Sequence, residues 1–193
     1  MSALVDKAIA AAGLDAIGEA RRAGDLAQVR AASAQLKGAD LLALGALADR
    51  VRSEEVGDVV RVYANVPPAE GAEVVVVPPQ TDGLSFLRAV AIARITGPRA
   101  ARVRVDWTAC GLEIAQVALG FGASELVGRI ANKRGLALAD DAMATSAKKS
   151  QALPAQLVKK RELAAIIRRS GRVPEMIDAG GRVEVEAVAG DRA

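Results

Sequence analysis

The polar side chains best placed for chemistry follow three stretches that we expect to be β-strands. Asn, Gln and Thr side chains donate and accept hydrogen bonds, but they transfer no proton near neutral pH. Ligand sites of parallel α/β folds form at the carboxyl ends of the strands, so these loops are expected to meet near one face. They indicate either a small polar pocket for a nucleoside or small carboxylate, or ordinary loop polarity, which is the simpler interpretation. The candidate ligand-binding residues are Tyr63, Asn65, Gln80, Thr81, Trp107, Thr108 and Cys110.

Three groups in the last of these regions each have a chemical interpretation and a plainer one. Cys110 precedes Gly111 at the expected start of a helix, where the pKa of a thiol falls and a thiolate becomes reactive. The simpler account is a packed or idle thiol. Asp106 is either a general base at a strand end or a partner of a neighbouring arginine or of solvent. The helix dipole is sufficient to explain Glu113, so we assign no catalytic residue.

The composition excludes several classes of active site. The 193 residues include no histidine and one cysteine. Ser–His and Cys–His nucleophile pairs are therefore excluded, as are thiolate zinc sites and an iron–sulfur cluster held by this chain alone. The chain has no glycine motif for binding nucleotide phosphates. We expect no metal site and no cofactor.

Charge and hydropathy argue against nucleic-acid and membrane partners. The formal net charge is +3 and aromatic residues make up 2% of the chain, which leaves little for bases to stack on. The basic clusters at 148–149, 159–161 and 168–169 are expected to be solvated helix faces. No apolar run reaches membrane-spanning length, and the N-terminus lacks the pattern of a signal peptide. These features predict a cytoplasmic protein.

The patterning predicts an α/β fold with a helical region before it. Residues 1–56 have helical periodicity, with Asp15 and Asp25 as expected caps. Strands are expected at 58–64, 74–77 and 101–107, and the Val-rich 74–77 run is typical of a strand buried on both faces. A helix is expected between the second and third of these strands, with Ser85 near its start and Gly97 after its end, and another at 112–121. Residues 57–130 are thus expected to form a β/α core with a parallel sheet. Residues 131–159 are expected to be a flexible connection or lid, and 160–193 a C-terminal helix and a tail with an edge strand.

Four stretches resemble the radical S-adenosylmethionine enzymes of the futalosine route to menaquinone, namely aminofutalosine synthase and dehypoxanthine futalosine cyclase. Residues 39–66 are similar to the helix and first barrel strand of that family, and 74–95 to its sixth strand and following helix. Residues 101–128 are similar to its seventh and eighth strands with the helix between them, and 161–178 to its C-terminal helix and ending. The stretches occur in the order that the family has.

The chain lacks the cysteine motif on which the chemistry of this family depends. The CxxxCxxC loop that holds the iron–sulfur cluster should follow the first strand, but residues 65–68 read NVPP, and Cys110 lies elsewhere. Radical chemistry by this chain alone is thus excluded by the number of cysteines. The interval from Asp58 to Gly135 is also far shorter than the roughly 250 residues of a full eight-stranded barrel.

The resemblance implies a half TIM-barrel of about four strands, corresponding to the first, sixth, seventh and eighth of the family. These strands are neighbours in a closed barrel, so they are expected to form one arc with an exposed apolar inner face. A second copy, a different half-barrel partner or the helices of residues 1–56 would cover that face. We therefore expect a degenerate, non-catalytic interaction or assembly protein that self-associates. A nucleoside- or S-adenosyl-binding module and a barrel-completing subunit of a cluster-bearing enzyme are the alternatives.

Overall fold

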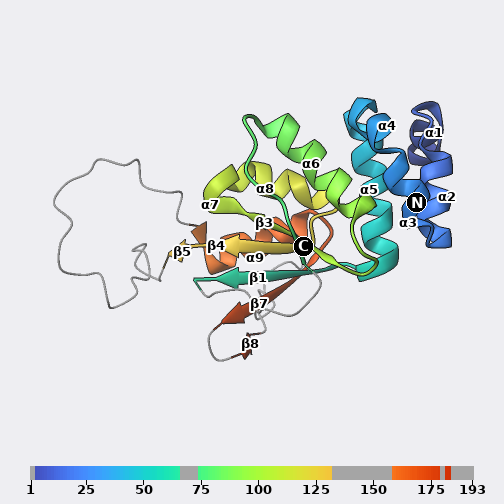
Figure 1. The fold of residues 1–193 in the computed structure, drawn as a ribbon. Coiled ribbons are helices and arrows are strands. Elements are labelled where there is room, and N and C mark those ends of the chain that lie inside the picture. The colour runs from blue at the N-terminus through green and yellow to red at the C-terminus, as the bar shows by residue number, and fades with distance from the viewer. Residues whose placement is uncertain (1–2, 66–73, 132–157, 179–180, 184–193) are drawn as a thin grey trace.

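The computed structural model describes residues 3–65, 74–131, 158–178 and 181–183, and it has an α/β fold (Figure 1). The described part of the helical region forms five helices that precede the first strand. They pack around one another and bury one apolar stripe each, as the periodicity predicts. Their bounds are α1 (Ala3–Ala11), α2 (Asp15–Ala23), α3 (Leu26–Ala31), α4 (Ser33–Gly38) and α5 (Leu41–Val56).

Aspartates and a glycine set the boundaries of these helices. Asp25 and Asp40 cap α3 and α5, because their carboxylates accept hydrogen bonds at 2.9 Å from backbone N–H groups of the first turn. Gly24 ends α2 in the left-handed conformation, with φ of 83°. The prediction that Asp25 caps a helix is confirmed. Asp15 was predicted to do the same, but it is the first residue inside α2 and Leu14 stands at the cap.

The main sheet has six strands in the order β2-β3-β4-β1-β7-β8. The first five of these are parallel, and β8 pairs antiparallel with β7 at the edge. The four strands that the resemblance places side by side are neighbours in this sheet. The elements of this region are β1 (Val59–Ala64), β2 (Val74–Val76), α6 (Gly83–Thr96), β3 (Arg102–Asp106), α7 (Trp107–Cys110), α8 (Leu112–Ala118), the 3₁₀ turn η1 (Leu119–Phe121) and β4 (Glu125–Gly128).

The C-terminal part adds strands to the four expected in the arc, among them an edge strand in the tail, where one was predicted. Helix α9 (Lys160–Arg169) is followed by β7 (Val173–Asp178), which extends the parallel sheet on the far side of β1, and then by the edge strand β8 (Gly181–Val183). A separate parallel pair joins β5 (Ile130–Ala131) to β6 (Val158–Lys159). Between these two strands, residues 132–157, which include most of the expected connection and the 148–149 basic cluster, lie outside the described residues.

One face of the sheet carries the hydrophobic core. Alternate residues of neighbouring strands, among them Val60, Val62, Val103, Val105 and Leu126, pack against α5, α6, α8 and α9 in a single cluster. The strand residues between them point to the opposite face, since successive side chains of a strand alternate. Within the described residues, therefore, helices cover one face of the sheet. That second face carries charged side chains instead of the expected apolar surface.

The N-terminal helices do not cover the second face. Helices α1 and α2 pack on α5, and α3 and α4 pack on α6, so that they lie beyond these two helices at one end of the molecule (Figure 1). Their buried residues belong to the same core cluster as the helix-covered face of the sheet. The interpretation in which residues 1–56 close the open face is accordingly wrong. No helix in the described part of the chain is long and apolar enough to cross a membrane.

The buried Arg94 joins α6 to the amino-terminal ends of β3 and β4. Arg94 of α6 donates to the carbonyl oxygens of Gly122 at 2.9 Å and Ala101 at 2.5 Å, and to Ser124 Oγ at 2.8 Å. Burial lowers the pKa of Arg94 to about 10. These contacts hold the loops before β3 and β4, away from the carboxyl ends of the strands where the candidate residues lie.

Candidate functional site

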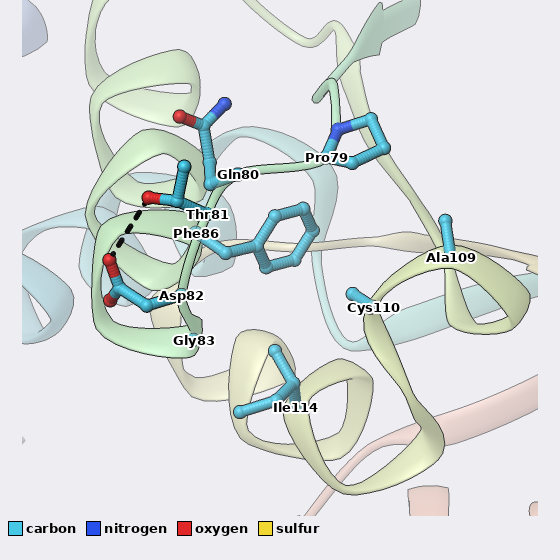
Figure 2. Close-up of a pocket in the computed structure, with 9 residues that line it drawn as sticks. All are labelled: Pro79, Gln80, Thr81, Asp82, Gly83, Phe86, Ala109, Cys110 and Ile114. Carbon is cyan, nitrogen blue, oxygen red and sulfur yellow. Dashed lines mark hydrogen bonds between the residues drawn. The ribbon is translucent and has the colours of Figure 1, made fainter.

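A hollow of about 250 Å³ lies at the carboxyl ends of β2 and β3 (Figure 2). The loop from β2 to α6 forms one wall, and α7 with the start of α8 forms the other. Figure 2 shows the Phe86 ring projecting between these walls, with Cys110 and Ile114 on the second wall and Gln80 and Thr81 along the rim. The volume is just below the usual range for drug-sized ligands, so the hollow suits a compact molecule. Its lining residues are Pro79, Gln80, Thr81, Asp82, Gly83, Phe86, Ala109, Cys110 and Ile114.

Asp82 is a rim residue that our sequence analysis did not single out. It is the N-cap of α6, where its carboxylate accepts hydrogen bonds from Ser85 N at 2.9 Å and from Ser85 Oγ at 2.7 Å. These hydrogen bonds, the backbone one foremost, hold the pKa of Asp82 below its usual value. The helix was expected to begin near Ser85. Asp82 directly before the helical stretch is the N-cap residue that places the start of α6 at Gly83.

Cys110 carries a protonated thiol near neutral pH. Burial raises the pKa of Cys110 to about 11, and the nearby Asp106 carboxylate acts in the same direction. The residue ends the short helix α7, and Gly111, with φ of 86°, separates it from α8. Cys110 thus ends one helix instead of starting another, and the geometry favours the packed thiol over a reactive thiolate.

Asn65 and Trp107 make hydrogen bonds that stabilise the ends of the strands, and they do not line the hollow. Asn65 adopts φ of 59°, and its side-chain amide pairs with the backbone of Ile130 through two hydrogen bonds, of 3.2 and 3.3 Å. The buried indole of Trp107 donates from Nε1 to the carbonyl oxygen of Arg129 at 3.2 Å and lies against Gly128. Both residues thus tie the ends of β1 and β3 to the chain that follows β4.

Thr108 and Tyr63 also have local partners. Asp106 accepts hydrogen bonds from Thr108 N at 2.8 Å and from Thr108 Oγ1 at 2.7 Å, which caps α7 and explains this carboxylate without a role as a base. Tyr63 is buried on the second face of the sheet, with the Arg104 guanidinium 5.8 Å from its ring centroid. Of the seven candidate residues, the hollow brings together Gln80, Thr81 and Cys110.

The second face of the sheet carries a row of alternating charges, which our sequence analysis did not predict. Arg104 of β3, Glu125 of β4, Arg61 of β1 and Glu175 of β7 occupy directly opposed positions on four adjacent strands. Arg104 Nε is hydrogen-bonded to Glu125 Oε1, and Arg61 Nε lies 3.1 Å from Glu175 Oε2. We call these four residues the ionic row.

Mostly apolar positions flank the ionic row on both sides. The row toward the carboxyl ends contains Asp106, Val127, Tyr63 and Ile177, from β3 across to β7. The row toward the amino ends includes Arg102, whose guanidinium donates to the carbonyl oxygens of Val59 and Ser124 at 3.3 Å. Burial, with the neighbouring Arg61, lowers the pKa of Arg102. The face is thus a charged band between less polar bands.

These two places present hydrogen-bonding, ionic and apolar groups. The hollow has a carboxylate, an amide, a hydroxyl and a neutral thiol, and no basic side chain lines it. Among the described residues, no group of three or more Cys, Asp and Glu side chains is arranged to hold a metal ion. No known protein family and no curated protein matches the sequence of this chain.

Proposed function

We propose that the protein is a non-catalytic interaction or assembly protein that self-associates through the second face of its sheet. The observation that carries this proposal is the one-sided cover of five parallel strands within the described residues. Parallel sheets occur almost always with both faces covered, because their strands arrive through crossovers that place helices on the faces. A second copy of the chain supplies the missing cover.

We also propose that the chain is a shortened relative of the menaquinone-pathway radical enzymes, and that its sheet is half of a barrel. The order β2-β3-β4-β1 supports this proposal, because the corresponding strands of a closed barrel are neighbours. Helices on a single face also agree with a barrel, in which they surround the sheet. The antiparallel β8 departs from the barrel pattern at the edge.

The oligomeric state of the whole chain tests the first proposal. Sedimentation equilibrium and light scattering are expected to give twice the mass of the 19.9 kDa chain. Concentrations of roughly 1–50 µM cover the dissociation constants of stable and transient dimers. A monomer at every concentration would overturn the proposal. A monomer that forms a one-to-one complex with a different half-barrel protein would replace self-association by the barrel-completing alternative.

Binding of a small molecule in the hollow is a second candidate function. This function is favoured because the polar Gln80 and Thr81 line the same hollow as the apolar Phe86 and Ile114, at the carboxyl ends of the strands. Nucleosides and S-adenosyl compounds at millimolar concentration are expected to raise the melting temperature. The substitution Ile114→Trp fills the hollow and should abolish the shift, whereas Val117→Trp, at an exposed position one turn along α8, should preserve it. No shift with any compound contradicts this function.

A further inference from the structure

The ionic row is complementary to itself under one two-fold rotation. Read across β3, β4, β1 and β7, its charges are plus, minus, plus, minus. A two-fold axis parallel to the strands and midway between β4 and β1 reverses this order in the second copy. Arg104 then lies opposite Glu175, and Glu125 lies opposite Arg61. A two-fold axis across the strands keeps the order and opposes like charges, which specific interfaces avoid.

The neighbouring rows fit the same axis. The rotation that places β3 opposite β7 puts Arg102 across from Val173 and Asp106 across from Ile177, so neither charged residue meets a like charge. Val76 on β2 and Val173 on β7 are 60% and 57% exposed, although both are apolar. The half-buried Val127 lies near the axis, whereas Tyr63 beside it is already buried within one copy. The apolar positions of the two flanking rows thus come together in the interface.

The charges and the apolar groups contribute differently to this interface. Each ion pair of the ionic row already exists within one copy, and Glu125 is only 1% exposed there, so stacking two rows forms few new contacts and removes water from charged groups. Apolar contact between the flanking rows supplies the affinity. The ionic row sets the direction of association, because a two-fold axis across the strands, or one that runs along a strand, opposes like charges. The axis midway between β4 and β1 places all four charges of the row opposite an unlike charge.

We propose that two copies of the chain pack face to face through the ionic row, about a two-fold axis parallel to the strands between β4 and β1. The proposal rests on the proposed self-association and specifies its geometry. It also fits a shared barrel interior, since strands on opposite sides of a barrel run in the same direction.

Two exchanged pairs test the geometry without removing an ion pair from the single chain. The double substitution Arg61→Glu/Glu175→Arg changes the row to plus, minus, minus, plus. The double substitution Arg104→Glu/Glu125→Arg changes it to minus, plus, plus, minus. Under the proposed axis each variant opposes like charges at every position of its own second copy. Mixed with each other, the two variants oppose unlike charges throughout.

Sedimentation of each variant alone is expected to show a dimer dissociation constant raised at least about tenfold, and the mixture should form a one-to-one heterodimer near the wild-type affinity. The variant with all four residues exchanged should dimerise again by itself. Circular dichroism and thermal unfolding check that each chain folds, and the four-residue variant keeps the test decisive if the more buried Glu125 pair fails to fold. A dimeric wild type whose affinity these exchanges leave unchanged overturns this geometry but not self-association. A monomeric wild type overturns both.

Discussion

The Trp107 ring packs directly against the backbone of Gly128 at the carboxyl ends of the strands. A Cβ atom added at Gly128 would lie 2.3 Å from Cε2 of the Trp107 ring, which is too close for any side chain. We expect Gly128→Ala to displace the indole and to destabilise the protein by about 1–3 kcal/mol. Because the chain has one tryptophan, its fluorescence emission should shift to longer wavelength. Gly120→Ala is the control, since nothing lies within 4 Å of its added Cβ; equal behaviour of the two variants would contradict the contact.

The raised pKa of Cys110 predicts slow alkylation. With a pKa of about 11 instead of 9.0, the folded chain holds roughly a hundredfold less thiolate at pH 8 than an unfolded one. Deprotonation of this thiol favours the unfolded state, because the thiol loses its proton more easily there. Its contribution to the free energy of unfolding is therefore complete below pH 9 and is lost as the pH rises toward 11. Mass spectrometry after iodoacetamide treatment, with and without urea, measures the rates. Equal rates in the two conditions would refute the packed thiol.

Sequence patterns predicted part of the hollow at the scale of residues. Gln80, Thr81 and Cys110 were identified because the ends of parallel strands meet at one edge. Phe86 and Ile114 were not, because their place in the wall depends on how α6 packs on α8. The same limit applied to Asn65 and Trp107, whose partners follow β4 in a part of the chain distant in sequence.

At the scale of elements, β7 is a strand of the main sheet that the sequence did not predict. It contains Pro174, and proline within a run argues against a central strand. Pro174 stands opposite Val60 of β1, while the described part of β8 pairs only with Met176–Asp178. The missing N–H of proline is therefore tolerated on the side of the strand away from β1. The Val-rich run 74–77 was expected to be buried on both faces, but β2 is an edge strand and Val76 is exposed.

Arg94 holds α6 to the loops before β3 and β4. Its guanidinium donates to two carbonyl oxygens and one hydroxyl, and no acidic side chain contacts it in the described structure. We expect Arg94→Met to destabilise the chain by about 2–4 kcal/mol, because the buried acceptors lose their donors. Arg99→Met, at a side chain that is 57% exposed, should change stability by less than about 0.5 kcal/mol. Urea unfolding measures both variants, and similar losses would show that the hydrogen bonds of Arg94 contribute little.

At the scale of the whole molecule, α/β class and strand adjacency were predictable, but the sidedness of the sheet was not. Valine and arginine alternate in β1 and β3, as in Arg102–Asp106, a pattern that indicates one apolar and one polar face. The resemblance led us to expect an apolar inner face. The opposition of Glu125 and Glu175 to these arginines depends on register between strands distant in sequence, which local patterns do not contain.

A buried ion pair joins two of the N-terminal helices, and its arginine also binds the turn after α6 in the α/β core. Arg21 of α2 donates from Nε and Nη2 to the two carboxylate oxygens of Glu55 in α5 at 2.8 Å, and from Nη1 to the carbonyl oxygen of Gly97 at 2.6 Å. Arg21 is 1% exposed, so removal of its carboxylate leaves a buried charge without compensation.

We therefore expect Glu55→Ala to destabilise the whole molecule by about 3–5 kcal/mol. Glu54→Ala is the matched control, because this neighbouring side chain is exposed, and it should unfold within about 0.5 kcal/mol of the wild type. Hydrogen exchange should show faster exchange in α2 and in the turn after α6 for Glu55→Ala alone, since Arg21 links these two elements. If both variants unfold alike and α2 keeps its protection, apolar packing on α5, rather than this ion pair, holds the N-terminal helices to the sheet.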